Sequence, residues 1–308
     1  MTQIVTKMVK NWLKWTMLVG ILLSLTACNL QLSGLLDPKG VIAFEERKLF
    51  FDTLALMMIV VLPVIIMSFA FIYHYQVSHR TRDYKPNWSH SHFLESLWWG
   101  IPCIIIVVLA VITWKKTILL DPYRQIPGQT AAPMVIQAIA LPWKWVFIYP
   151  EENIATVNYV EVPVGREVEY QITADNVAMS AFFIPQLGSQ IYAMAGMRTR
   201  LHLIASVPGD FLGLNTQFNG DGFSDMTFMV HAVEPDQMQA WVTQVKQSAQ
   251  PLTPEAYGQL LNPSIADQPK FYNGVAPDLF QQVLTLYMNT SGTVHPRDNQ
   301  LKFHNSLN

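Results

Sequence analysis

The side chains that could hold a soft metal ion are scarce in this chain of 308 residues. There are two cysteines, Cys28 near the N-terminus and Cys103 in an apolar run. His202 and His231 are the only histidines between residues 130 and 290. Each lies in an alternating stretch, which predicts a solvated strand face. No zinc, thiolate-copper or iron–sulfur spacing appears, and no nucleophile–base arrangement stands out.

One loop nevertheless has residues at a spacing that would suit the ligands of a metal site. Its spaced positions, together with one upstream residue, are Asn215, Gln217, Asn219, Phe223, Met226 and Met179. This spacing resembles the metal loop of subunit II of the haem-copper respiratory oxidases, where cysteine, glutamate, histidine and methionine side chains hold a dinuclear copper centre. Copper held between two sulfurs needs thiolates, which amides and phenyl rings cannot replace. The resemblance therefore implies a vacated site, and we expect no metal in this chain.

The composition indicates a protein that is part membrane and part globular. Hydrophobic residues make up 51% of the chain and charged residues only 14%, which suits apolar spans joined to a folded domain. The formal net charge of -2 argues against a nucleic-acid partner.

The N-terminal segment has the pattern of a bacterial lipoprotein signal. Lysines precede an apolar run that ends in Leu25-Thr-Ala-Cys28, which looks like a lipobox. We expect a signal peptide over residues 1–27 and a diacylglyceryl group on Cys28. The alternative is an ordinary signal peptide in which the cysteine is coincidental.

Two apolar runs predict transmembrane helices over residues 49–75 and 94–114. Each is long enough to span roughly 30 Å at 1.5 Å per residue. Pro63 should kink the first helix. The alternative is a helical hairpin buried inside a soluble domain.

The lysines and arginines that flank the two runs do not decide the orientation, but a lipidated Cys28 would lie on the exported side of the membrane. We therefore expect residues 28–48 to be periplasmic, residues 76–93 to form a cytoplasmic loop, and everything after the second helix to be periplasmic. The expected location of the protein is therefore the inner membrane of a bacterium.

The remainder of the chain predicts a β domain followed by an arm. From about residue 130 apolar and polar residues alternate between turn signals, which favours an antiparallel β-sandwich over residues 130–235. With the vacated loop, this region resembles a cupredoxin-type domain. Residues 236–290 predict a proline-punctuated helical arm, and residues 291–308 a polar tail. The expected fold class is thus a two-helix transmembrane hairpin, a cupredoxin-type antiparallel β-sandwich and a short helical C-terminal arm.

A longer stretch of sequence indicates which branch of the oxidases the chain resembles. The run from Phe182 to Ile204, FFIPQLGSQIYAMAGMRTRLHLI, is similar to subunit II of the bacterial cytochrome bo-type ubiquinol oxidases. The resemblance covers nearly the whole chain, including the arm. It implies a complex that oxidises ubiquinol, reduces oxygen to water and pumps protons.

By that resemblance, the haems and the catalytic copper belong to subunit I, and this chain binds no cofactor of its own. Its expected partners are subunit I, the other oxidase subunits and the membrane, with no role for cytochrome c. Two alternatives are a free-standing membrane-anchored lipoprotein whose sandwich binds or senses a ligand, and a cytochrome c oxidase subunit II. The missing cysteines count against the second alternative.

The resemblance also assigns a role to Glu95. The pattern Glu95-x-x-Trp98-x-x-x-Pro102 looks like the start of the second helix throughout this family, where the glutamate lies at the cytoplasmic mouth of a proton channel. A simpler explanation is that a carboxylate in the first turn interacts favourably with the helix dipole.

Trp143 and Trp145 stand where copper-containing relatives use an aromatic pair for electron transfer; here we expect packing instead.

Overall fold

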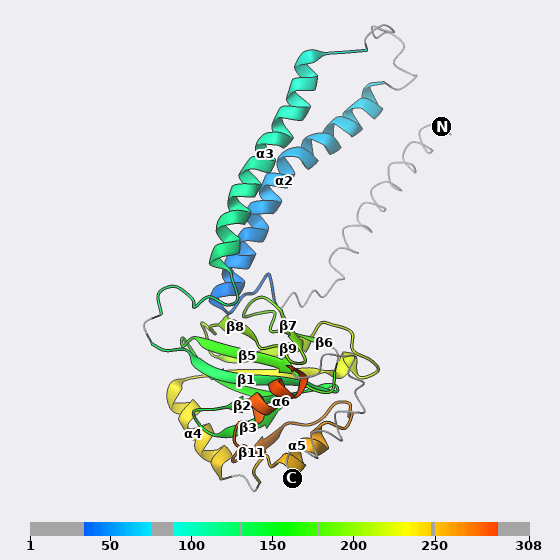
Figure 1. Ribbon diagram of the computed structural model, residues 1–308. Helices are drawn as coiled ribbons and strands as arrows, with labels where there is room; N and C mark the ends of the chain where they lie inside the picture. Colours follow the sequence, from blue (N-terminus) through cyan, green and yellow to red (C-terminus); the bar gives the residue numbers. More distant parts are fainter. Residues whose placement is uncertain (1–33, 76–88, 130, 178, 248–249, 289–308) are drawn as a thin grey trace, which may run out of the picture.

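The computed structural model describes residues 34–75, 89–129, 131–177, 179–247 and 250–288. Within these residues the protein has two parts, a long helical hairpin and a β-sandwich with an attached arm (Figure 1). Cys28, the predicted signal peptide, most of the 76–93 loop and the polar tail lie outside the described residues.

The hairpin consists of α2, Val41–His74, and α3, His92–Leu119. Both helices are long and apolar enough to cross a membrane, and in their most apolar windows only 0% and 6% of residues are buried within the described structure. A hairpin buried in a soluble core is therefore wrong. Glu45 of α2 and Lys116 of α3 form an ion pair near the sandwich, and the two helices diverge toward their far ends (Figure 1). The α2 helix continues through Pro63 and begins before the predicted residue 49.

The described part of the sandwich contains two sheets. The six-stranded sheet has the order β11-β3-β2-β1-β5-β8, and the five-stranded sheet has the order β4-β10-β9-β6-β7. The strands of the first sheet are β1 Met134–Leu141, β2 Lys144–Tyr149, β3 Ile154–Val157, β5 Val168–Ala174, β8 Thr199–Leu203 and β11 Lys270–Tyr272. Those of the second are β4 Tyr159–Pro163, β6 Met179–Phe183, β7 Ile191–Met194, β9 Gly209–Asn215 and β10 Thr227–Val233.

The sheets are mixed rather than purely antiparallel. The β1–β5 and β10–β4 pairs run parallel, whereas the other pairs run antiparallel. Alternation predicts which face of a strand is buried but carries no information about the direction of its neighbour. The expected antiparallel order therefore needs correction at these two pairs, whereas the two-sheet architecture is confirmed.

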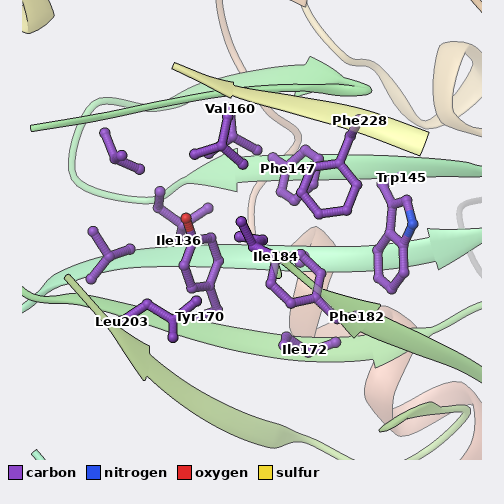
Figure 2. Packing of buried hydrophobic residues seen from close by; sticks show 14 of the residues in the cluster. Ile136, Trp145, Phe147, Val160, Tyr170, Ile172, Phe182, Ile184, Leu203 and Phe228 are labelled. Atoms are coloured by element: carbon purple, nitrogen blue, oxygen red, sulfur yellow. The ribbon is translucent and has the colours of Figure 1, made fainter. Parts of the chain in front are cut away.

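The inner faces of the two sheets enclose the main apolar core (Figure 2). In β5 the inward residues Val168, Tyr170 and Ile172 are almost fully buried, as the period of two predicts. At the centre, Phe182 stacks on Phe228 with ring centroids 5.0 Å apart and meets Trp145 edge-on at 5.3 Å. Such aromatic pairs add roughly 0.5–1.5 kcal/mol each beyond the area that they bury.

The arm packs on the sandwich in two places, because Met238, Val242 and Val245 join the main core whereas residues between 252 and 284 cover the opposite face of the six-stranded sheet. It consists of α4 Pro235–Lys246, α5 Pro254–Leu260, strand β11 and α6 Leu279–Met288. A second apolar cluster joins α5 and α6 to outward residues of β1, β2 and β3. Since β1 and β2 are buried on both faces, their sequences read as nearly continuous apolar runs. The arm is thus more than the expected proline-punctuated helical segment, because β11 also extends the sheet.

The hairpin is joined to the sandwich at the start of α2. The backbone of Gly40 bridges to Ala205 and donates to the carbonyl oxygen of Gln186 at 3.0 Å. Slightly further along, Ser189 Oγ donates to the Glu46 carboxylate. These contacts fix the first turn of α2 against the loops that lead into β7 and follow β8.

Candidate functional site

The vacated loop connects β9 to β10 at one end of the five-stranded sheet. Asn215 ends β9, Phe223 begins the short 3-10 helix η1, Phe223–Asp225, and Met226 directly precedes β10. Met179 begins β6, where it is half-buried and paired with Met194 of β7. The fold therefore brings the loop positions and the upstream segment to the same end of this sheet, as the resemblance implies.

Asn215 uses both ends of its side chain to hold backbone. Its Oδ1 accepts from the backbone N–H groups of Ala181 at 2.8 Å and Gln217 at 3.1 Å, and its Nδ2 donates to the carbonyl oxygen of Gln217 at 2.9 Å. The residue is only 5% exposed. A buried amide with its hydrogen bonds made is a structural element of the loop rather than a vacant ligand.

Asn219 links the loop to β6. Its Nδ2 lies 3.2 Å from Ser180 Oγ and 3.2 Å from the Met226 sulfur, and Met226 is buried. Its backbone carbonyl accepts from Trp143 Nε1 at 3.2 Å. Amide hydrogen bonds from Asn215 and Asn219 thus tie this loop to β6 and to Met226.

Two tryptophans pack beneath and beside this loop. Trp145 is fully buried in the main core, and Trp143 lies against the loop glycines. A Cβ added at Gly222 would come within 2.5 Å of the Trp143 ring, so the ring occupies the space that a side chain would need. The packing role expected for both residues agrees with these contacts.

The donor set at the loop does not fit a dinuclear copper centre. The six positions offer amides, two thioethers and a phenyl ring, with no thiolate or imidazole among them. The amide groups of Asn215 and one end of Asn219 already bind neighbouring groups. Among the described residues, the cluster of three potential metal-binding side chains lies elsewhere, at the start of α3.

Glu95 lies in the first turn of α3, as predicted. Ser91 caps this helix, accepting from the backbone N–H of Leu94 at 3.5 Å. Glu95 Oε2 lies 3.5 Å from His90 Nε2 and 3.9 Å from His92 Nδ1, and the Glu95 side chain is 45% exposed. The carboxylate is therefore accessible to water and lies beside two imidazoles. The sequence places His90 and His92 close together in the loop before the second helix, where solvation at the membrane interface is the simpler interpretation, but it does not show that they converge on Glu95.

His202 is a correction to the expectation of a solvated strand face. It is 4% exposed, and its Nδ1 lies 2.8 Å from Oε1 of the equally buried Glu167. The same Glu167 oxygen accepts from the backbone N–H of Ile126 at 2.9 Å, in the segment after α3. That segment covers the outer face of β8, which strand alternation alone could not reveal. His231, in contrast, keeps an exposed pairing with Asp210.

A buried carboxylate ties the arm to the sandwich. Asp175, which follows β5, is 1% exposed and accepts from Tyr257 Oη at 2.7 Å and from Tyr287 Oη at 2.6 Å. Burial raises the pKa of Asp175, and the hydrogen bonds from the two tyrosines oppose that rise. Burial likewise raises the pKa of Tyr257 well above its ordinary value. The hydrogen bonds of the two tyrosines thus add to the apolar cluster and to strand β11 in attaching the arm to the sandwich.

Comparisons with known proteins agree with this architecture. The family described as COX Aromatic Rich Motif matches residues 246–291, the region that supplies Tyr257 and Tyr287. The chain is 46% identical over 275 residues to a cytochrome bo(3) ubiquinol oxidase subunit 2 of Pseudomonas aeruginosa, covering 89% of this chain and 81% of that protein. It is 42% identical over 268 residues to a ubiquinol oxidase subunit 2 of Acetobacter aceti, covering 87% and 86%.

Among solved structures, the periplasmic domain of cytochrome oxidase subunit II of Bradyrhizobium japonicum aligns with a TM-score of 0.36 and 23% identity, covering 37% of this chain and 94% of that one.

The apolar hairpin, the two-sheet sandwich and the arm that matches the COX Aromatic Rich Motif together identify the chain as an oxidase subunit of the subunit II class. At the identities given above, the chain belongs to the ubiquinol oxidase subunit 2 family.

Proposed function

We propose that this chain is the copper-free subunit II of a proton-pumping ubiquinol oxidase, a complex that oxidises ubiquinol and reduces oxygen to water. The observation that carries the proposal is the 46% identity over 275 residues to a ubiquinol oxidase subunit 2. The matched region covers 89% of this chain and 81% of that relative. The haems and the catalytic copper belong to subunit I, which is the principal partner.

The chemistry of the vacated loop supports a quinol rather than a cytochrome c as electron donor. A soluble cytochrome that docks from the periplasm needs a metal near the surface to receive its electron. Ubiquinol is dissolved in the bilayer and can reach subunit I without crossing the sandwich. The hydrogen-bonded amides of Asn215 and Asn219 are compatible with a domain that binds no cofactor and transfers no electrons.

The same proposal includes an orientation in a bacterial inner membrane. Residues 28–48 and the sandwich over residues 130–235 are periplasmic, the 76–93 loop is cytoplasmic, and Cys28 carries a lipid after removal of residues 1–27. The two apolar helices and the lipobox pattern support this arrangement. The hairpin would bind subunit I within the membrane, where its exposed apolar side chains can be covered.

Glu95 would then supply protons to subunit I. In this orientation the start of α3 faces the cytoplasm, where proton uptake begins, and the Glu95 carboxylate is accessible to water. An ionised carboxylate can accept a proton from water and release it toward a neighbouring channel. Its position in the first helical turn also stabilises the helix, so the two roles are compatible.

Affinity purification of the tagged full-length chain tests the proposal. A haem-bearing complex that consumes oxygen with ubiquinol, and does not oxidise reduced cytochrome c, is the expected result. Recovery of the chain alone, without haem absorption, would favour the free-standing lipoprotein. Oxidation of cytochrome c by the purified complex would favour a cytochrome c oxidase.

A further inference from the structure

The ends of α2 and α3 that lie next to the sandwich (Figure 1) carry two lysines whose charges are not compensated. Lys48 of α2 and Lys115 of α3 are both exposed, and neither forms an ion pair with a residue that the structure describes. Their neighbour Lys116 differs, because it is half-buried and pairs with Glu45 across the hairpin. The two exposed ammonium groups are therefore available to an anionic ligand.

The pairing of the helices turns both lysines to one side of the hairpin. Glu45 and Lys116 meet between the two antiparallel helices. At 3.6 residues per turn, Lys48 lies about 60° short of a full turn from Glu45, and Lys115 lies about 100° before Lys116. Because the helices run in opposite directions, these rotations of the same sense point both lysines to the same side of the pair.

The distance between the two lysines suits a shared ligand. Their offset along the helix axes is about 3 Å at a rise of 1.5 Å per residue, and the axes of packed helices lie about 8–10 Å apart. A lysine has a flexible four-carbon stem, so both ammonium groups can reach one phosphate group.

The apolar stretches of the hairpin put these lysines at the level of the lipid headgroups. No Asp, Glu, Lys or Arg occurs over residues 53–79 or 96–114. Lys115 directly follows the second stretch, and Lys48 lies one helical turn before Asp52, which borders the first. The headgroup layer adds about 5–7 Å to each side of the apolar core of a bilayer. Trp114 is 73% exposed and suits the same layer, where indole rings are enriched.

We propose that Lys48 and Lys115 bind the phosphate group of an anionic phospholipid, whose acyl chains lie along the apolar side chains one turn deeper. Phe51 follows Lys48 by three residues, and Val111 precedes Lys115 by four, so each shares a helix face with its lysine. They are 47% and 52% exposed. Two cations above an apolar surface complement a headgroup of net negative charge and its attached chains.

Other charges nearby limit the affinity of this site. Arg47 adds positive charge, although its guanidinium group lies 5.1 Å from the centre of the Phe44 ring and donates to the carbonyl oxygen of Leu36. The exposed Asp52, one turn deeper than Lys48, opposes an anion. A zwitterionic lipid should bind less well, because its own cationic group would lie near the lysines. The attraction between exposed charges is also screened by salt.

The competing explanation is that both lysines are ordinary interfacial anchors that contact any headgroup. The two explanations differ in lipid selectivity. The site requires the hairpin to lie in a membrane, but it does not depend on the electron donor of the proposed oxidase.

Native mass spectrometry of the full-length protein, purified from membranes and titrated with phosphatidylglycerol or phosphatidylcholine, tests the site. The wild type should bind phosphatidylglycerol at concentrations at least about tenfold below those needed for phosphatidylcholine, since each lysine near a membrane surface changes the affinity for anionic lipid about fivefold. Lys48→Gln/Lys115→Gln should lose this preference. Lys246→Gln/Lys270→Gln changes two exposed lysines of the arm and is the matched control that should keep it.

A second double variant separates the loss of charge from a loss of folding. Lys48→Arg/Lys115→Arg keeps both charges and should keep the preference for phosphatidylglycerol. Equal affinity of the wild type for the two lipids would overturn the site. Equal affinity of the wild type and the glutamine variant for phosphatidylglycerol would overturn it as well.

Discussion

Glu95 combines a structural position with a proposed chemical role, and the two roles make different predictions. A carboxylate in the first turn of a helix contributes about 0.3–1 kcal/mol to helix stability through the dipole. Proton delivery, in contrast, affects turnover and leaves the folded state unchanged. The neighbouring His90 and His92 leave the carboxylate about half-exposed, so water can reach it in either case.

Glu95→Gln and Glu95→Ala should both slow steady-state oxygen consumption at saturating ubiquinol while haem content and assembly stay normal. The reason is that neither side chain can accept a proton from the cytoplasmic side. Glu151→Gln, which changes an exposed carboxylate of the sandwich, is the control and should turn over normally. Normal rates in both Glu95 variants would exclude the residue from the mechanism.

Asp175 should make the stability of the sandwich depend on pH. Burial raises its pKa in the folded state above the unfolded value of about 3.9, so the folded state binds this proton more tightly. Its contribution to the free energy of unfolding is therefore complete below about pH 4 and is lost as the pH rises through the folded pKa.

Asp175→Asn should flatten this decline, because the amide does not ionise. Urea unfolding of a fragment covering residues 125–290, from pH 4 upward, measures the slope for both proteins. Asp221→Asn, at an exposed loop position, should keep the wild-type slope. A steeper decline in Asp175→Asn than in the wild type would contradict the assigned direction.

At the scale of elements, the sequence predicts which face of a strand is buried better than it predicts which segments lie next to that strand. The alternation in β5 correctly identifies Tyr170 and Ile172 as core residues, because a half-buried strand must alternate. It cannot identify His202 as buried, since the covering segment near Ile126 follows α3 and is distant in sequence. The addition of β11 to the sheet was missed for the same reason.

The candidate site likewise has some features that the sequence predicts and others that it does not. The spacing of the loop from Asn215 to Met226 places it correctly between two strands, because resemblance transfers local spacing well. The amide network around Asn219 depends on contacts with Trp143, in the turn between β1 and β2, and with Ser180 of β6, and both residues are distant from Asn219 in the sequence. The convergence of His90 and His92 on Glu95 depends on side-chain positions, which the sequence does not give.

The vacated loop should not bind copper in stoichiometric amounts. The fragment covering residues 125–290, loaded with copper and desalted, is expected to stay colourless, because none of the loop positions supplies a thiolate. Metal analysis together with visible absorption measures this. A coloured product with two copper ions per chain would contradict it.

The joint between hairpin and sandwich has no room for a side chain at Gly40. An added Cβ would lie 2.4 Å from the carbonyl oxygen of Leu187 and 2.9 Å from that of Ile204, and backbone atoms cannot move aside individually. Gly40→Ala should therefore destabilise the joint by about 1–3 kcal/mol, in the range of overpacked cores.

The midpoint of thermal unfolding of the detergent-solubilised chain, followed by circular dichroism, measures this effect. Gly258→Ala is the matched control, because an added Cβ there meets no atom within 4 Å and alanine is favoured in the helix by roughly 0.5–1 kcal/mol. Gly40→Ala should lower the midpoint and Gly258→Ala should not. Equal midpoints would mean that the joint adapts to the extra methyl group.

At the scale of the whole molecule, three attachments to the membrane are proposed: the lipid on Cys28 and the two helices. Cys28→Ser should leave the precursor without lipid and with its signal segment attached. The variant should still sediment with membranes, because one lipid group adds modestly to anchoring by transmembrane helices.

Mass spectrometry of the N-terminal peptide distinguishes the two forms. The wild-type peptide should begin at a lipid-modified Cys28, whereas Cys103→Ser, which changes the exposed cysteine of α3, should keep that modification. An unmodified Cys28 in the wild-type protein would disprove lipidation.

The joint between α2 and the sandwich also has a consequence for the order of biogenesis. Glu46 and Ser189, which meet there, are 143 positions apart in the sequence. At about 5–20 residues per second, roughly 7–30 s pass between the synthesis of the first and the second. Both helices leave the ribosome within that interval, so the hairpin can enter the bilayer before its attachment point on the sandwich exists. The joint is therefore made late, and a defect there should let the chain insert normally yet leave its sandwich loosely tethered to the hairpin.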